Sequence, residues 1–246
     1  MAIYDVNGNE IASGGGSGFP GLPLSPVLGT NFLIRHYGGN SHANFVAAVN
    51  NGYVATEGDV RFTSDEIPVM AHDSSVGGLS IATHTLAELE AVATIYKLDD
   101  WLLDCKKFNV FADVDFTKTY TNRQCEILVA HLGNMGMTGR ASIECGISYA
   151  TVLVQYSKNL LLNLLSATSE ANINRFAAVE DSCKGIICTT AVESVNPSIV
   201  EFIHKKGYIS KVWNSSDSVA STTNYLNMGV DQVIVDTTKP SNITPA

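Results

Sequence analysis

The sequence predicts a single (β/α)₈ barrel, an α/β fold in which eight parallel strands alternate with helices. Two observations predict this fold. The chain has 246 residues, 45% of them hydrophobic, which is the size of one such barrel and enough to bury one large core. From residue 31 onward, short apolar runs alternate with segments of helical periodicity, a pattern that favours βαβ units in a parallel sheet. An open doubly wound sheet is the alternative.

Each strand is expected where an apolar run begins. The predicted runs, in chain order, are 32–35, 54–57, 110–113, 141–144, 160–162, 185–188, 208–211 and 232–235. Helix candidates lie between them, and one follows Ser216 and Asp217, which can cap its N-terminus, and ends before Gly229. Residues 31–246 are therefore predicted to form the barrel domain.

Residues 1–30 differ in composition and are predicted to be an N-terminal arm or linker. Residues 3–11 have the pattern of a short hairpin with Asn7-Gly8 at its turn, and residues 12–26 are rich in Gly, Ser and Pro. The N-terminus lacks the basic and apolar regions of a secretory signal, and no stretch approaches the roughly 20 apolar residues that span a membrane. We therefore expect a cytoplasmic protein without a transmembrane segment, although export by another route stays open.

Charge and cysteine content exclude several classes of function. The formal net charge is −9, which argues against binding nucleic acid or an anionic membrane through bulk electrostatics. Five cysteines form no C-x-x-C pair and leave one unpaired, so they are expected to be small buried hydrophobes rather than a disulfide framework. A bound phosphate would need a local cation, which a divalent metal can supply. The sequence leaves the oligomeric state open.

Acidic residues fall where the second and third predicted strands end, the end that carries the chemistry of such barrels. Glu57 and Asp59 are two apart, so both side chains leave the same face of their strand, and Asp113 and Asp115 repeat this spacing on the neighbouring strand. Converging carboxylates repel, and Mg²⁺ or Ca²⁺ would hold them ionised. The four acids are therefore candidate metal ligands; the alternative for any single one is a solvated acid at a strand end.

Two histidines flank the pair Glu57 and Asp59 in the sequence. His36 follows the first predicted strand, and His72 follows the short apolar run 68–71. Histidine is the side chain best suited to proton transfer near neutral pH, so His36 and His72 are candidates for a general acid and base pair. Among the other histidines, His42 lies only six residues after His36 and can reach the same end of the barrel.

The order of these residues resembles the signature of the glycerophosphodiester phosphodiesterases. That family reads H-R-G, P-E-N-T, E-x-D-V, T-x-D-G-x-P-V and H-D, and the chain has His36, Asn40 and the segments 57–60, 63–69 and 72–73 in that order. Similar segments follow at 85–89, 98–102, 212–214 and 229–236, so the resemblance extends over about residues 32–238.

The resemblance implies a fold, a reaction and a set of roles. It implies a (β/α)₈ barrel that hydrolyses a glycerophosphodiester or a related alkyl phosphodiester with a divalent metal, Mg²⁺ or Ca²⁺. His36 and His72 would be the acid and base, and Glu57 and Asp59 would be metal ligands. Asp113 lies where the family has its third carboxylate ligand.

The resemblance also implies how the substrate is bound and cleaved. Asn40 and Trp213 would contact a small-molecule phosphodiester from lipid metabolism, although Trp213 is equally suited to be a wall aromatic. A neighbouring hydroxyl of the substrate would attack the phosphorus and form a cyclic phosphate. One histidine would take the proton of that hydroxyl, and the other would protonate the leaving alkoxide.

The chain departs from the family pattern at three positions. Tyr37 replaces an arginine, Gly39 a glutamate, and Asp115 a lysine. Two cationic phosphate contacts are thus missing, and a tyrosine hydroxyl cannot replace the bidentate contact of an arginine. Lys211, near a strand end, is the candidate to replace them and bind substrate; Lys118 is the other, expected to be a solvated loop residue.

Three alternatives remain open at the sequence level. The missing cations resemble, to a limited degree, the sphingomyelinase-type phospholipases and lyases, although those relatives keep a lysine that this chain lacks. A catalytically impaired barrel could serve as a binding or structural module. A metal-dependent barrel could also act on a sugar or another non-phosphate substrate, in which case the cleft should carry stacked aromatics.

Overall fold

The structure, a computed structural model, describes residues 2–4, 10–13, 32–213 and 216–243. Eight parallel strands form a closed barrel, in which the first strand pairs with both the second and the last. These strands are β3 (Phe32–Arg35), β4 (Ala55–Phe62), β8 (Phe111–Asp115), β9 (Ala141–Cys145), β10 (Leu161–Leu164), β11 (Gly185–Ala191), β12 (Ile209–Trp213) and β13 (Gln232–Val235). The predicted (β/α)₈ barrel is confirmed, and the pairing of β13 with β3 excludes an open sheet.

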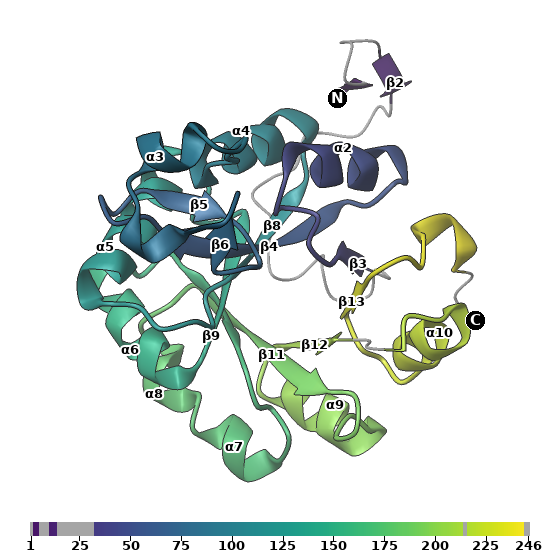
Figure 1. Cartoon of the computed structure of the whole chain (residues 1–246). Helices are drawn as coiled ribbons and strands as arrows, with labels where there is room; N and C mark the ends of the chain where they lie inside the picture. Colours follow the sequence, from purple (N-terminus) through teal and green to yellow (C-terminus); the bar gives the residue numbers. More distant parts are fainter. Residues whose placement is uncertain (1, 5–9, 14–31, 214–215, 244–246) are drawn as a thin grey trace.

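Helices lie on the outside of this barrel (Figure 1). They are α2 (His42–Asn50), α4 (Leu98–Phe108), α5 (Asn122–Asn134), α6 (Ile147–Tyr156), α7 (Glu170–Asn174), α8 (Ala177–Glu180), α9 (Pro197–Lys205) and α10 (Val219–Asn227), with the 3₁₀ helix η2 (Pro240–Asn242) after the last strand. Among the helices of the described residues, none is both long and apolar enough to cross a membrane.

The start of α10 differs from the prediction. Ser218, not Ser216 or Asp217, is its N-cap and accepts a hydrogen bond from the Ser221 backbone N–H. The Asp217 carboxylate instead accepts the backbone N–H groups of residues 236–238, after β13. Asp217 therefore joins α10 to the last strand rather than capping the helix.

An excursion between β4 and α4 builds a small second core beside the barrel. It contains β5 (Pro68–Met70), antiparallel to β4, the pair β6 (Ser75–Val76) and β7 (Leu79–Ser80), the 3₁₀ helix η1 (Ile81–Thr83) and α3 (Leu86–Glu90). Val69, Ile81 and Leu89 are its buried centre. The sequence pointed to this segment through His72, the apolar run 68–71 and the family-like segments 63–69 and 85–89, but not to its strands and second core; His72 places it at the mouth of the barrel.

The N-terminal segment is described only in part. β1 (Ala2–Tyr4) and β2 (Glu10–Ser13) pair antiparallel, as the predicted hairpin requires. Its turn at Asn7-Gly8 and residues 14–26 of the predicted linker lie outside the described residues. The division into an arm of residues 1–30 and a domain of residues 31–246 remains a prediction.

Side chains inside the barrel form layers, because every second residue of a strand faces the interior. The lowest layer is apolar and comprises Ile34, Ala55, Phe111, Leu161, Ile187, Ile209 and Ile234. The residues two positions further along the same strands are all polar: His36, Glu57, Asp113, Asn163, Thr189, Lys211 and Asp236. An apolar floor therefore carries a polar layer at the C-terminal ends of the strands.

The main core fills the space between this barrel and its helices. Trp101 of α4 is fully buried there, with Phe45 of α2 and Leu128 of α5 in the same cluster. Four of the five cysteines are buried and the fifth, Cys183, is half-buried, which agrees with their predicted role as small hydrophobes. This packing fixes the strands whose ends carry the polar layer.

Candidate active site

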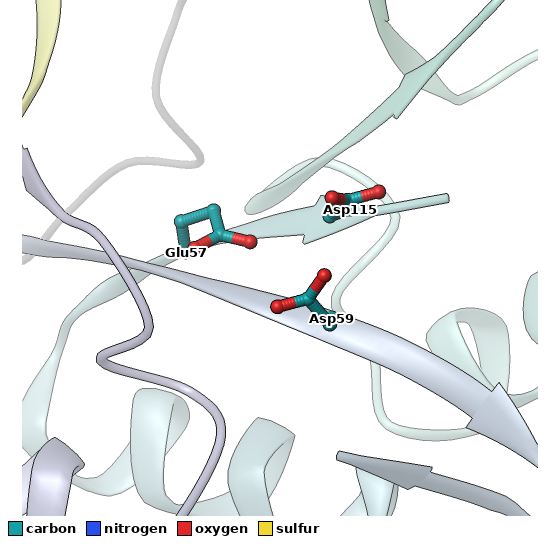
Figure 2. Close-up of side chains that lie close together, drawn as sticks. All are labelled: Glu57, Asp59 and Asp115. Carbon is teal, nitrogen blue, oxygen red and sulfur yellow. The ribbon is translucent and has the colours of Figure 1, made fainter. Parts of the chain in front are cut away.

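Three carboxylates converge at the mouth of the barrel. Glu57 and Asp59 extend from β4 and Asp115 from the end of β8, and their side chains face one another (Figure 2). One oxygen of each lies within 4.8 Å of the others, so these three described residues could together hold a metal ion. We call Glu57, Asp59 and Asp115 the carboxylate cluster.

Asp113, the other predicted metal ligand, lies outside this cluster. The strand register sets Asp113 beside Glu57 and Asp115 beside Asp59, so Asp113 belongs to the lower of the two polar levels. Glu57 is one methylene longer than an aspartate and reaches the upper level. Asp113 is fully buried, and its carboxylate accepts hydrogen bonds from Ser142 and Lys211. Its charge is therefore paired inside the barrel.

Lys211, predicted to bind substrate, is the partner of that charge. Its side chain is fully buried, and its ammonium donates to Asp113 and, at 2.6 Å, to Glu144. Burial alone would lower the pKa of Lys211, but the two carboxylates outweigh it and raise that pKa above its usual value. Lys211 is therefore a buried cation that does not line the mouth of the barrel.

Glu57 lies under a tight turn formed by the residues after β3. Tyr37 has a left-handed backbone (φ 54°), and its N–H donates to Glu57 Oε2 at 2.8 Å. A Cβ on Gly39 would lie 2.5 Å from the ring of Trp101, so the glutamate that the family has there does not fit. Burial and the neighbouring Asp59 raise the pKa of Glu57 well above its usual value. A metal ion would relieve this cost by stabilising the ionised form.

Asp59 is held in place by two side chains. Asn40 Nδ2 donates to Asp59 Oδ2 at 2.8 Å, and the Asp59 backbone N–H donates to Asn40 Oδ1 at 2.7 Å. Lys118 Nζ donates to Asp59 Oδ1 at 2.9 Å. Burial raises the pKa of Asp59, but the hydrogen bonds from Lys118 and Asn40 outweigh it and lower that pKa below its usual value. Asn40, predicted to bind substrate, thus contacts a predicted metal ligand.

Asp115 is the member of the cluster that replaces a family lysine. Its carboxylate accepts the Thr117 backbone N–H at 2.8 Å and lies 3.4 Å from Lys118 Nζ. Burial raises the pKa of Asp115. Ionising this carboxyl, like ionising Glu57, therefore costs free energy that a bound metal ion would offset. The cluster offers only hard oxygen donors, which is the chemistry that Mg²⁺ and Ca²⁺ prefer.

The two predicted catalytic histidines lie beside the cluster and on either side of Tyr37. His36 Nδ1 lies 2.6 Å from Asp236 Oδ1, and His36 Nε2 lies 4.0 Å from Glu57 Oε2. His72 Nδ1 lies 2.9 Å from Asp73 Oδ1. The Tyr37 ring stacks on His36, with ring centroids 3.6 Å apart, and meets His72 edge-on at 4.8 Å.

These groups line a cavity of about 320 Å³, which we call the mouth cavity. Its walls are His36, Tyr37, Glu57, Asp59, His72, Asp115, Thr117, Lys118, Glu144, Leu165, Trp213 and Ile234. Trp213 is 48% exposed and meets His36 edge-on, so it is a wall aromatic of the cavity. The structure therefore brings the two histidines, three of the four acids and Trp213 together.

Sequence reasoning assigned no role to three polar residues of this site, and expected Lys118 to be solvated. Glu144 is the last residue but one of β9, and Asp236 follows β13; the rule that polar residues at barrel strand ends carry function would have selected both. Thr117 gave no signal. His42 does not line the mouth cavity; at the start of α2 it pairs with Asp104 of α4 at 2.9 Å and lines a different cavity.

Comparisons with solved structures identify the fold. A glycerophosphodiester phosphodiesterase from Parabacteroides distasonis is 20% identical, with a TM-score of 0.68 over 83% of this chain and 92% of that one. One from Agrobacterium tumefaciens is 17% identical, with a TM-score of 0.68 over 84% and 96%. An Oleispira antarctica phosphodiesterase, solved with the product sn-glycerol-3-phosphate, is 18% identical, with a TM-score of 0.66 over 83% and 92%.

No protein-family model matches the sequence, and no curated protein matches it either. At identities of 17–20%, the similarity to the three structures shows a shared fold and does not show a shared function. The chain thus shares the (β/α)₈ fold of solved glycerophosphodiester phosphodiesterases.

Proposed function

We propose that this protein cleaves a glycerophosphodiester or a related alkyl phosphodiester with the aid of Mg²⁺ or Ca²⁺. The observation that carries the proposal is the carboxylate cluster, whose oxygens lie within 4.8 Å of one another beside His36 and His72. The shared fold supports it, as does the product sn-glycerol-3-phosphate bound by the Oleispira antarctica phosphodiesterase. The substrate would be a small molecule bound in the mouth cavity.

In this proposal Glu57, Asp59 and Asp115 hold the metal ion. When bound, the ion would polarise the phosphoryl oxygens and offset their negative charge, as a Lewis acid does. Asp115 takes the place that the family resemblance gave to Asp113, because the charge of Asp113 is already paired with Lys211. Asn40 keeps Asp59 oriented through two hydrogen bonds, which makes it a positioning residue.

His36 and His72 are the proposed acid and base. In each, Nδ1 faces a carboxylate, Asp236 for His36 and Asp73 for His72. An Nδ1–H that donates to this carboxylate leaves Nε2 as the proton acceptor, and stabilises the imidazolium that forms. One histidine would take the proton of the attacking substrate hydroxyl, giving a cyclic phosphate, while the other protonates the leaving alkoxide.

Lys118 is the proposed cationic contact to the phosphate. It lines the mouth cavity with 31% of its side chain exposed, whereas Lys211 is fully buried. Asp59 and Asp115 raise the pKa of Lys118 despite its partial burial, so it remains an ammonium ion at neutral pH. A metal ion that takes over the carboxylates would free this ammonium to bind a phosphoryl oxygen, and Trp213 would pack against the alcohol portion.

Phosphorus NMR tests the proposal. The protein is incubated with glycerophosphoethanolamine, glycerophosphocholine and a lysophospholipid, in Mg²⁺ or Ca²⁺, beside the variant Asp59→Asn. We expect a new cyclic or linear phosphate resonance with the wild type and its loss with the variant. The absence of turnover for every diester, in protein that binds the metal, would favour a binding module and contradict the proposal.

A further inference from the structure

A second cavity lies beside the first and shares a catalytic residue with it. This cavity, of about 450 Å³, is lined by Asn40, Ser41, His42, Ala43, Val69, Met70, Ala71, His72, Asp73, Ser75, Val76, Ile81, Thr94, Ile95 and Tyr96. We call it the side cavity. His72 lines both cavities, and Asn40, on its wall, is hydrogen-bonded to Asp59 of the carboxylate cluster.

The inner wall of the side cavity is apolar. Val69, Met70 and Ile81 are buried, and Val76 and Ile95 pack on the same small core of the excursion. No lysine or arginine is among its lining residues in the described part of the chain, whereas the mouth cavity contains Lys118. The lysine that can hold a phosphate is therefore in the mouth cavity, and the side cavity, lined by Asp73 and histidines rather than by lysine or arginine, is the less suitable site for an anion.

We propose that the side cavity binds an aliphatic substituent of the substrate, an alkyl or acyl chain carried by the alcohol portion of the diester. This inference rests on the proposed function, because it takes the phosphate to lie at the carboxylate cluster. A phosphate held there has His72 between it and the side cavity, so an ester substituent that passes His72 enters the apolar space. The preferred substrates are then diesters with a hydrocarbon chain rather than small polar ones.

Size and chemistry agree with this occupant. A volume of about 450 Å³ lies within the range of about 300–1,000 Å³ that is usual for small-molecule sites. Burying one methylene contributes about 0.8 kcal/mol, which corresponds to about a fourfold change in affinity. The dependence of affinity on chain length therefore measures whether the chain is buried in the protein or remains in water.

The test uses n-alkyl phosphates, monoesters that a diesterase does not cleave, with chains from methyl to octyl. Their affinities for the wild-type protein are measured by calorimetry in Mg²⁺. We expect the dissociation constant to fall about two- to fourfold with each added methylene and then to level off when the cavity is full. Equal affinities across the series would overturn the inference.

Thr94→Trp tests the location. Thr94 is an exposed residue of the cavity wall, so an indole there fills the cavity without disturbing the small core. Ser75→Trp does the same from β6 and serves if the first variant does not fold. Leu103→Trp, which changes a residue of α4 that is 55% exposed and lies outside both cavities, is the matched control. We expect the first two variants to lose the chain-length dependence while methyl phosphate binds unchanged, and the control to keep it.

The two proposals can fail separately. Turnover of glycerophosphoethanolamine with no chain-length dependence in binding would leave the proposed function intact and remove this inference. Chain-length-dependent binding that Thr94→Trp removes, without turnover of any diester, would support the side cavity as a lipid-chain site and contradict the catalytic proposal. Chain-length dependence that survives both tryptophan variants in folded protein would put the chain elsewhere and contradict the inference.

Discussion

Lys118 Nζ lies 2.9 Å from Asp59 Oδ1, so a side-chain cation already contacts the carboxylates that are proposed to hold a metal ion. The same ammonium lies 3.4 Å from Asp115. A metal ion and this ammonium compete for the same oxygens, because both neutralise the same charge. Lys118 therefore links metal binding to the availability of a cation for the phosphate.

Lys118→Met should tighten metal binding and weaken substrate binding. Removing the competing ammonium should lower the dissociation constant for Mg²⁺ or Ca²⁺ by about tenfold, measured by calorimetry, which corresponds to about 1.4 kcal/mol. The KM for a diester should rise, since the phosphate loses its cation. Lys97→Met, which removes a half-buried lysine that is paired with Asp100 and does not line the mouth cavity, is the control. Unchanged or weaker metal binding would show that the two cations do not compete.

His36→Ala and His72→Ala should each lower kcat by about 10²–10⁴-fold, the usual contribution of a positioned proton transfer. Both variants should bind metal and melt near the wild-type temperature, because neither ring belongs to the apolar core. The comparison is with His131→Ala, which removes a histidine of α5 that is paired with Asp99 and does not line the mouth cavity. Full kcat in either site variant would end the acid and base assignment.

Glu57→Gln should stabilise the metal-free protein at neutral pH. Because burial and Asp59 raise the pKa of Glu57, the folded state binds this proton more tightly than the unfolded state. The contribution of Glu57 is thus fully present below its unfolded pKa of about 4.3, and is lost as pH rises through the raised folded value. In chelator at pH 7.5 the variant should melt about 2–4 °C above the wild type. This is the shift that a gain of about 1 kcal/mol in the free energy of unfolding produces in a chain of this size.

The same comparison at pH 4 provides the internal control. Glu57 is then protonated in the folded wild type, so the two melting temperatures should converge. With saturating metal at pH 7.5 the order should reverse, because the wild type gains binding energy that the variant loses. A variant that is less stable than the wild type in chelator at pH 7.5 would contradict the assigned cost of the Glu57 charge.

Lys211→Met should destabilise the fold rather than act on substrate binding alone. It would leave the buried carboxylate of Asp113 and the partly buried one of Glu144 without their cation, and breaking a buried pair costs about 3–5 kcal/mol. Urea unfolding measures this loss. The double variant Lys211→Met/Asp113→Asn should recover part of it, since one orphaned charge is then removed. Unchanged stability together with a raised KM would instead support the sequence-based prediction that Lys211 binds substrate.

The barrel could be predicted because its signals are local. Each strand coincides with an apolar run, and the spacing of Glu57 and Asp59 is enough to set both on one face of β4. The sequence also predicted that the strands carrying these acids are neighbours. In the structure β4 pairs with β8, with Asp113 beside Glu57 and Asp115 beside Asp59. The fold and the strand positions of the acids could therefore be predicted from hydrophobic periodicity and strand order.

The choice between residues of the same face could not be predicted. Whether Asp113 or Asp115 joins Glu57 depends on Lys211, which is 98 residues away in sequence and enters the barrel from β12. In the sequence, Lys118 looks like a solvated loop residue. The turn after β8 nevertheless brings its ammonium group to Asp59. Such pairings are set by the closed barrel, and no local pattern encodes them.

The most direct test of the central claim, that the mouth of this barrel is a metal-dependent phosphodiesterase site, is a phosphorus NMR time course on glycerophosphoethanolamine. Mg²⁺ or Ca²⁺ is present first, chelator is added next, and excess metal last. Cleavage that stops with chelator and resumes with metal, and that is absent throughout in Asp59→Asn, is the predicted result. Cleavage that continues in chelator, or no cleavage by folded protein with metal bound, would contradict the claim.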